Sequence, residues 1–172
     1  MPKKIVVIGP ESTGKSTLTE ALASHFREPW VPEYAREYLE KLDRPYEFND
    51  LLNIAKGQVA LEESQLKLAN KYLFCDTDLH VLQVWSESKY KEVHPWILAQ
   101  IEVRRYDLYI LTDIDTTWEP DPLREHPEPE MRQFFFDWYR NLLEKSGTSF
   151  QVVRGDKENR ISQALRFINQ IL

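Results

Sequence analysis

The sequence feature that most constrains the fold is an octapeptide, G-P-E-S-T-G-K-S, which runs from Gly9 to Ser16. It follows the short apolar run Ile5–Ile8 and precedes a segment with helical spacing of apolar residues. The pattern G-x-x-x-x-G-K-[ST] between a strand and a helix is typical of a loop whose backbone N–H groups surround phosphates. Such a loop needs glycine at Gly9 and Gly14 because it takes backbone conformations that a side chain disfavours. The chain is therefore expected to carry this loop at the edge of an α/β sheet.

The last residues of the octapeptide and the residue after it have expected contacts with a nucleotide and its metal ion. Lys15 is expected to place its ammonium beside the β- and γ-phosphates, and the hydroxyl of Ser16 suits Mg²⁺. The following helix directs its positive N-terminal end at the same site, where Thr17 adds a contact to the α-phosphate. The expected cofactor-binding residues of this loop are Gly9, Glu11, Ser12, Thr13, Gly14, Lys15, Ser16 and Thr17. We therefore expect a purine nucleoside triphosphate with Mg²⁺, and the alternative is an ordinary glycine turn.

The rest of the chain indicates one α/β domain. Its 172 residues, 42% hydrophobic and 29% charged, suffice for a single core. Short β-branched or aromatic runs alternate with longer segments of helical spacing, which is typical of helices packed around a parallel sheet. Strands are expected at Lys4–Ile8, Trp30–Val31, Tyr72–Cys75, Leu108–Leu111 and Phe150–Val153. Helices are expected at Lys15–Phe26, Asp50–Asn70, Leu79–Ser88, Pro95–Arg104, Glu130–Lys145 and Glu158–Ile171. The predicted fold is thus a three-layer α/β fold with a five-stranded parallel sheet, formed by residues 1–172 as one domain.

Charge and composition narrow the classes of partner. Lysine and arginine number 22 against 28 aspartates and glutamates, a net charge of −6, so the chain lacks the basic surface that nucleic-acid binding requires. No stretch approaches the roughly 20 consecutive apolar residues of a membrane-spanning helix, so no membrane partner is expected. A single cysteine, Cys75, excludes an intramolecular disulfide and fits a reducing, cytoplasmic location. The aromatic run Phe134–Phe136, with Trp138 and Tyr139, has the spacing of a buried helix face and leaves a homo-oligomer open.

A second metal-binding position is expected at the end of the third strand. Four apolar residues, Tyr72–Cys75, are followed by Asp76, which places a carboxylate at the carboxyl edge of the sheet. A phosphate-binding loop needs such a carboxylate for Mg²⁺. Asp78 is a second candidate here and is also expected to bind substrate. For both residues the alternative role is to cap the next helix. Because Thr77 follows Asp76 where a hydrolase carries a water-polarising glutamate, we expect transfer to a second substrate. The sequence has neither a D-x-x-G nor an N-K-x-D guanine motif, which disfavours a GTPase.

The acceptor site is expected after the second strand, in P-E-Y-A-R-E-Y. Here Glu33 is a candidate proton acceptor for a substrate hydroxyl, and Arg36 either holds that carboxylate or steers phosphate, with the ring of Tyr34 beside them. Trp85 is a further candidate, which would stack on a heteroaromatic ring. The alternatives are a surface Glu33–Arg36 pair at the start of an amphipathic helix and a Trp85 that belongs to the core.

A lid is expected over residues 113–130, which hold four prolines and seven carboxylates and cannot form a regular helix. Its one unambiguous cation, Arg124, is the candidate that reaches the transferring phosphoryl group while the lid excludes water. The alternative is a local ion pair on a solvated loop. Near the C-terminus, Arg160 opens the last helix beside Gly155 and is expected to border the adenine.

Five segments together resemble the ribosylnicotinamide kinase domain of NadR-type NAD-metabolism proteins: G-P-E-S-T-G-K-S-T, P-E-Y-A-R-E-Y, F-C-D-T-D, H-P-W and T-W-E-P-D-P-L-R. The resemblance covers nearly the whole chain and implies a P-loop kinase that uses ATP and Mg²⁺ to phosphorylate the ribose 5′-hydroxyl of nicotinamide riboside. Carried over by position, the resemblance implies that Lys15 and Ser16 bind the phosphates and the metal ion. It implies that Asp76 binds the metal ion or the acceptor hydroxyl. It places Glu33, Tyr34 and Arg36 on the acceptor side and Arg124 in the lid.

The chain also departs from the family pattern. It contains no H-x-G-H adenylyl-transfer motif, so we expect neither the adenylyltransferase nor the DNA-binding domain of longer family members. Ala35 stands where relatives often have glycine, and the lid is richer in proline and acid. The identity of the acceptor therefore stays open, with another nucleoside or a small sugar as the nearest alternative within this class. Outside it, a nucleotide-dependent switch or interaction module is the alternative.

Overall fold

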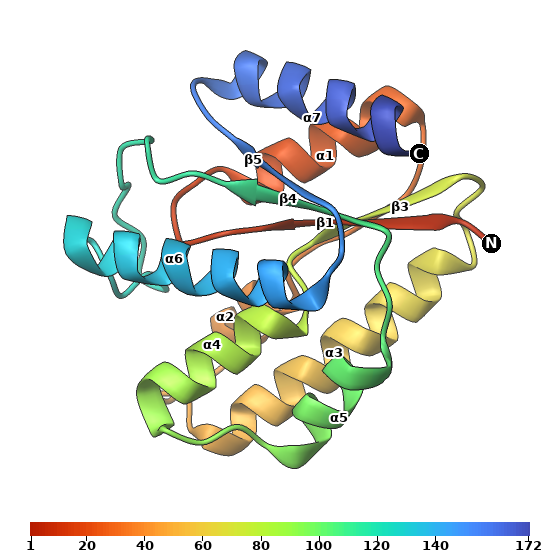
Figure 1. Cartoon of the computed structure of the whole chain (residues 1–172). Helices are drawn as coiled ribbons and strands as arrows, with labels where there is room; N and C mark the ends of the chain where they lie inside the picture. The colour runs from red at the N-terminus through yellow and green to blue at the C-terminus, as the bar shows by residue number, and fades with distance from the viewer.

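Alternating side chains along the strands explain why helices cover both faces of the sheet. In β1 (Lys3–Ile8), Ile5 and Val7 pack on one face while Val6 and Ile8 pack on the other, and all four are fully buried. A strand that is apolar on both sides is typical of a parallel sheet with two covered faces. The computed structural model describes all 172 residues and has this architecture (Figure 1). Its five strands are all parallel, in the order β2-β3-β1-β4-β5.

The elements alternate along the chain as expected for a parallel sheet. The remaining strands are β2 (Trp30–Val31), β3 (Tyr72–Asp76), β4 (Leu108–Thr112) and β5 (Phe150–Val153). The helices are α1 (Lys15–Phe26), α2 (Tyr34–Glu40), α3 (Phe48–Leu66), α4 (Leu79–Tyr90), α5 (Pro95–Val103), α6 (Pro129–Ser146) and α7 (Lys157–Ile171). None of the helices combines the length and the apolar character that a membrane crossing requires.

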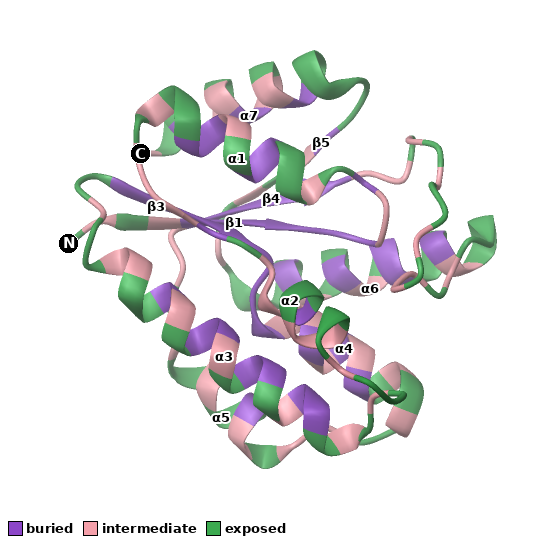
Figure 2. Ribbon diagram, turned by 180° about the vertical axis from the view of Figure 1, so that it is seen from behind, coloured by how far each residue is buried: buried purple, intermediate pink, exposed green.

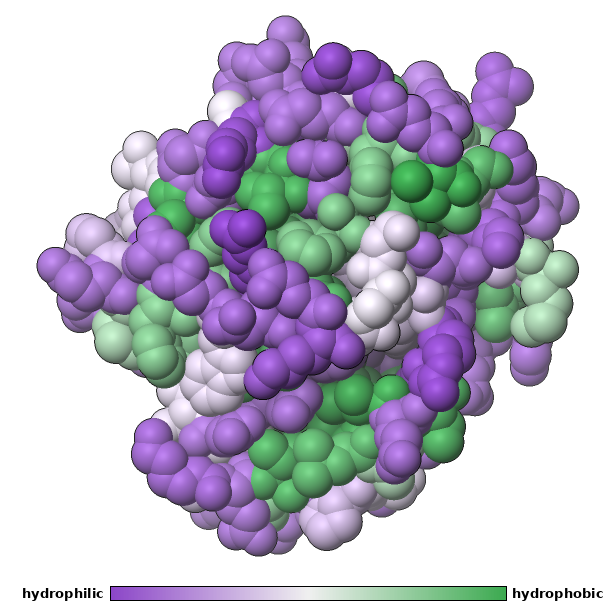
Figure 3. All heavy atoms as spheres, in the orientation of Figure 1, coloured by the Kyte–Doolittle hydropathy of each residue, from purple (hydrophilic) through white to green (hydrophobic).

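The helices form two layers, with the strands buried between them (Figure 2). The helices α1 and α7 cover one face of the sheet, and the opposite face packs against α4 and α6. A third apolar cluster joins α2, α3, α4 and α5 away from the sheet. Apolar atoms also gather in the lower part of Figure 3, where α4 and α5 lie, and α5 keeps Leu98 and Val103 exposed. The predicted three-layer α/β fold is confirmed.

The expected elements match the observed ones closely, and the differences have local causes. All five strands lie where expected, to within one residue at each end. The long helix begins at Phe48 instead of Asp50, because Asp50 serves as the third residue of a capping box whose first residue is Glu47. The short helix α2 was expected only as an alternative, since its seven residues carry little periodic signal.

Candidate active site

The loop after β1 has the conformation of an anion-binding cradle. Ser12 and Gly14 lie in the left-handed backbone region, with φ of 57° and 76°. The Thr13 hydroxyl lies 2.8 Å from the Pro10 carbonyl oxygen, to which it donates, and 2.6 Å from the Thr112 hydroxyl at the end of β4. These bonds fix the loop between two strand ends, so its open N–H groups form a concave anion site of the nest type.

Close packing explains the first glycine of the motif. A Cβ atom at Gly9 would lie 2.2 Å from Oγ1 and 2.9 Å from the backbone oxygen of Thr112, and the φ of Gly9 is 153°. Both the space and the backbone conformation therefore exclude a side chain. Gly9 thereby allows β1 and β4 to approach at the point where the loop begins.

The helix α1 begins with unsatisfied N–H groups that face the same site. Its N-cap is Gly14, which offers no side-chain acceptor, and its first turn contains no acidic residue. An uncapped N-terminus of this kind leaves backbone donors and the positive end of the helix dipole available to an anion. The Lys15 ammonium lies 2.9 Å from the Pro10 carbonyl oxygen and so folds back over the loop. The predicted phosphate-binding residues thus lie together.

Ser16 and Asp76 form the pair that suits a magnesium ion. The Ser16 hydroxyl donates to Oδ2 of Asp76, while Oδ1 of Asp76 is buried without any hydrogen-bond partner. Burial, and then the negative charge of Glu33, raises the pKa of Asp76 to about 6. An orphaned carboxylate oxygen beside a hydroxyl is a hard-oxygen donor set of the kind Mg²⁺ prefers, so these residues fit the ion.

Asp78, expected to bind substrate, instead lies inside the protein. Its carboxylate accepts the His80 backbone N–H at 3.0 Å, contacts the His80 ring Nδ1 at 2.7 Å and accepts the Tyr109 hydroxyl at 2.7 Å. Although burial opposes ionisation, the charge and hydrogen bonds of His80 hold the pKa of Asp78 below its ordinary value. Asp78 caps α4 and does not line the cavity. The capping alternative is therefore the one that the structure supports.

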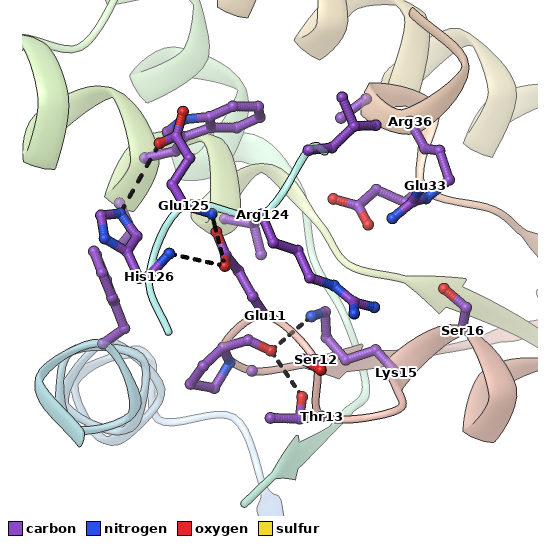
Figure 4. A pocket seen from close by; sticks show the side chains of 18 of the residues that line it. Glu11, Ser12, Thr13, Lys15, Ser16, Glu33, Arg36, Arg124, Glu125 and His126 are labelled. Atoms are coloured by element: carbon purple, nitrogen blue, oxygen red, sulfur yellow. Dashed lines mark hydrogen bonds and ion pairs between the residues drawn. The ribbon is translucent and has the colours of Figure 1, made fainter. Parts of the chain in front are cut away.

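A cavity of about 450 Å³ extends from the phosphate-binding loop to α4 and the lid (Figure 4). Its walls combine the whole loop, the start of α2, one face of α4, the lid and two aromatic rings of α6. The lining residues are Gly9, Pro10, Glu11, Ser12, Thr13, Gly14, Lys15, Ser16, Thr17, Glu33, Ala35, Arg36, Leu39, Val81, Val84, Trp85, Ser88, Lys89, Leu123, Arg124, Glu125, His126, Phe135 and Tyr139. The loop and the expected acceptor segment therefore share one space.

The acceptor candidates separate into residues that line this cavity and one that does not. Glu33, Arg36 and Trp85 line it. Figure 4 shows Glu33 beside Arg36, on the side of the cavity where Ser16 also lies. Tyr34 is directed elsewhere, because its ring packs on Gly57 of α3, where a Cβ atom would come within 2.0 Å of it. The prediction that Tyr34 faces the acceptor is therefore not supported by its position.

The indole of Trp85 is held by residues that the sequence did not single out. Its Nε1–H donates to the Tyr46 hydroxyl at 2.7 Å, and that hydroxyl donates to Oε1 of Glu125 at 3.0 Å. The Lys89 ammonium lies 3.6 Å from the centre of the Tyr46 ring. The motifs give no signal for Tyr46, Lys89 or Glu125. These residues lie before α3, on α4 and in the lid, and they come together only in the folded chain.

Within the segment 113–128, the predicted lid, residues 123–126 line the cavity. The Glu11 carboxylate accepts the backbone N–H of Glu125 at 3.1 Å and that of His126 at 3.2 Å. The Ser12 hydroxyl accepts the backbone N–H of Glu119 at 2.8 Å. Arg124 donates to the Glu119 carbonyl at 2.6 Å and lines the cavity, and Figure 4 shows its guanidinium near the Lys15 ammonium. The lid is therefore fastened to the phosphate-binding loop by Glu11 and Ser12.

Arg160, expected to border the adenine, lies behind the loop. Its guanidinium is buried and donates to the carbonyl oxygens of Gly155, Thr13 and Asp113 at 2.8, 3.0 and 3.1 Å, and it also pairs with Asp115. Arg160 does not line the cavity. The prediction is corrected here, because all these donors are already engaged by the protein.

Comparison with known proteins agrees with this geometry. Residues 4–160 match the family model AAA_28, described as an AAA domain. The chain belongs to this family. It is also 31% identical to the trifunctional NAD biosynthesis/regulator protein NadR of Escherichia coli strain K12, over 98% of this chain and 42% of that protein. The chain thus spans less than half the length of the curated relatives it matches. The resemblance inferred from the motifs is confirmed.

The fold of the chain is similar to that of several solved structures. A crystal structure of NadR protein in complex with NR superposes with a TM-score of 0.83 at 23% identity, covering 99% of this chain and 49% of that one. A deoxyadenosine kinase from M. mycoides with bound products superposes with a TM-score of 0.62 at 14% identity, covering 98% and 100%. At these identities the likeness establishes the fold alone.

Proposed function

We propose that this chain is an ATP- and Mg²⁺-dependent kinase that phosphorylates the ribose 5′-hydroxyl of nicotinamide riboside to give nicotinamide mononucleotide. The observation that carries the proposal is the single cavity that joins the phosphate-binding loop to a lid-covered pocket lined by Glu33, Arg36 and Trp85. Such a space would bring two substrates together, as direct transfer between them requires. Similarity to NadR and a fold shared with NadR bound to NR support this acceptor.

On the nucleotide side, the loop and α1 would bind the phosphates of ATP. The N–H groups of the loop surround the anion, and the Lys15 ammonium moves from the Pro10 carbonyl to the β- and γ-phosphates. Ser16 and Asp76 would hold Mg²⁺, which neutralises charge on the phosphates. Because burial disfavours the ionised form of Asp76, a bound cation would favour it again.

On the acceptor side, we assign the proton-accepting role to Glu33. Glu33 lines the cavity and is close enough to Asp76 for its charge to raise the pKa of that carboxyl. A carboxylate there would orient the 5′-hydroxyl and accept its proton as the bond to the γ-phosphorus forms. Arg36 would steer the phosphate groups at the same end of the cavity. Trp85 would offer an apolar ring face to the base, since its only donor is already bound to Tyr46.

The lid would favour transfer over hydrolysis. Arg124 lines the cavity from the lid, so its guanidinium is placed to stabilise the charge of the transferring phosphoryl group. The hydrogen bonds of Glu11 and Ser12 to lid backbone would keep the lid closed and so keep water from the γ-phosphate. We propose that residues 1–172 act as one kinase domain in the cytoplasm, with a small nucleoside as partner.

A nucleoside panel tests the proposal. The protein is incubated with ATP, Mg²⁺ and nicotinamide riboside, adenosine, cytidine, thymidine or ribose, and 5′-monophosphates are quantified by chromatography. We expect product from nicotinamide riboside at the highest kcat/KM, and none from Lys15→Ala with an unchanged fold. Higher kcat/KM with another nucleoside would establish the alternative acceptor. Nucleotide binding without any phosphorylated product would instead favour a switch or interaction module.

A further inference from the structure

Two buried arginines donate hydrogen bonds to backbone carbonyl oxygens of the phosphate-binding loop. Arg132 comes from the first turns of α6 and Arg160 from the first turn of α7. Nη2 of Arg132 donates to the Ser12 carbonyl oxygen at 3.4 Å, beside the Thr116 hydroxyl, which donates to the same oxygen at 3.0 Å. Nη1 of Arg160 donates to the Thr13 carbonyl oxygen at 3.0 Å. Neither arginine lines the cavity. Two consecutive carbonyls of the loop are thus engaged from outside.

The planarity of the peptide bond links these carbonyls to the donors of the loop. In a trans peptide the N–H points opposite to the C=O of the same unit, and the chain contains no cis peptide. With the carbonyls of Ser12 and Thr13 directed at the arginines, the N–H groups of Thr13 and Gly14 point the other way, toward the cavity that these residues line. Neither N–H donates to another backbone group.

We propose that Arg132 and Arg160 are positioning residues that set the phosphate-facing orientation of the Thr13 and Gly14 N–H groups without contacting the nucleotide. The inference rests on the proposed nucleotide binding and adds to it a cause for the loop conformation. Left-handed backbone at Ser12, with φ of 57°, is unfavourable for a residue with a side chain. The loop therefore needs external bonds to stay in the cradle conformation.

The forked shape of the guanidinium explains why arginine occupies both positions. While one nitrogen of Arg132 reaches Ser12, Nη1 donates to the carbonyl of Thr116 at 2.9 Å. Arg160 likewise joins Thr13 to Asp113. Each side chain thus ties the loop to the base of the lid with fixed geometry. A lysine in either position supplies a similar charge but no planar fork, so it cannot hold both carbonyls in the same way.

Lysine substitution with matched controls tests this role. The variants Arg132→Lys and Arg160→Lys are compared with Arg140→Lys on α6 and Arg166→Lys on α7, both exposed arginines on the same two helices. The Kd of ADP with Mg²⁺ is measured by titration calorimetry, well below each variant's melting temperature. We expect the two test variants to bind about ten-fold more weakly, as loss of a supporting partner typically does, and the controls to bind like the unmodified protein. KM for ATP should rise while KM for the acceptor stays constant.

The amide signals of the loop provide a second readout. On addition of ADP and Mg²⁺, the amide protons of Thr13 and Gly14 should shift downfield in the unmodified protein and less in the test variants. Arg132→Gln and Arg160→Gln replace the lysine variants if those fail to fold. A test variant that loses thermal stability but binds ADP as tightly as its control overturns the positioning role. Failure of the unmodified protein to bind ADP would refute the proposed nucleotide site itself, a separate result.

Discussion

Removal of the Glu11 carboxylate should loosen the lid. In the structure this carboxylate accepts two backbone N–H groups of the lid, from Glu125 and His126, at 3.1 and 3.2 Å. Glu11→Ala deletes both acceptors and leaves the loop backbone in place. The lid then stays attached through Ser12, whose hydroxyl accepts the Glu119 N–H. The closed state should therefore become less populated without loss of the fold.

The size of the effect follows from the two hydrogen bonds. A bond to a charged group contributes about 1.5–3 kcal/mol. Both bonds here are long, and the lid backbone is partly exposed, so we take about 1.5 kcal/mol for the pair. Since about 1.4 kcal/mol is a factor of ten, Glu11→Ala should reduce the ratio of closed to open lid about ten-fold.

Limited proteolysis measures this ratio directly. Trypsin cleaves after Arg124, which lies within the lid, so the cleavage rate there reports the open fraction when reclosing is fast. Glu11→Ala should be cleaved about ten-fold faster than the unmodified protein and should lose kcat/KM for the acceptor. The control is Glu119→Ala, since Glu119 contacts the loop only through its backbone N–H. Equal cleavage rates at Arg124 in Glu11→Ala and the control would refute the reasoning.

Three further substitutions test the site and its support. Gly9→Ala should lower the free energy of unfolding by about 2–4 kcal/mol in denaturant titration, because its Cβ would clash with Thr112. The control Gly147→Ala, at a position with a positive φ but open space, should lower it by only about 1 kcal/mol. Equal losses in the two variants would contradict the clash. Asp76→Asn should reduce kcat by about a hundred-fold at saturating Mg²⁺. The variant should melt no lower than the unmodified protein at neutral pH, because burial disfavours the ionised carboxylate that the amide replaces. A markedly lower melting temperature would show a structural role instead. Asp50→Ala should lose about 2 kcal/mol of stability. Arg44 holds the pKa of Asp50 below its ordinary value of 3.8, so this contribution is present above about pH 4 and is lost as the pH falls below it. The stability difference between the two proteins should therefore shrink in acid, and a constant difference would exclude the ion pair as its source.

The strands and the loop were predictable because their signals are local. Apolar runs of four residues bounded by polar residues mark β1, β3 and β4, and all three runs are buried on both faces. The octapeptide carries its own glycines at the positions where backbone geometry demands them, as Gly9 and Gly14 show. Asp76 follows the same logic, since the last residue of an internal parallel strand lies at the carboxyl edge of the sheet.

The roles of Asp78, Tyr34 and Arg160 were not predictable, because each depends on contacts between distant segments. Asp78 is bound by Tyr109 on a strand that begins 30 residues later. Tyr34 turns toward Gly57, whose missing side chain leaves room for its ring. Arg160 donates to the carbonyl oxygen of Thr13, which precedes it by 147 residues. A polar residue beside a motif therefore has either a ligand or a protein partner, and only the packed structure distinguishes them.

The most direct test of the proposed transfer is a crystal structure of this protein with nicotinamide riboside, Mg²⁺ and a non-hydrolysable ATP analogue. The account predicts the triphosphate on the loop N–H groups, the ion between Ser16 and Asp76, and the ribose 5′-oxygen within about 3.5 Å of the γ-phosphorus, in line with the bond to be broken. The Glu33 carboxylate should contact that oxygen. A riboside bound outside the cavity, or a 5′-oxygen directed away from the γ-phosphate, would contradict the account.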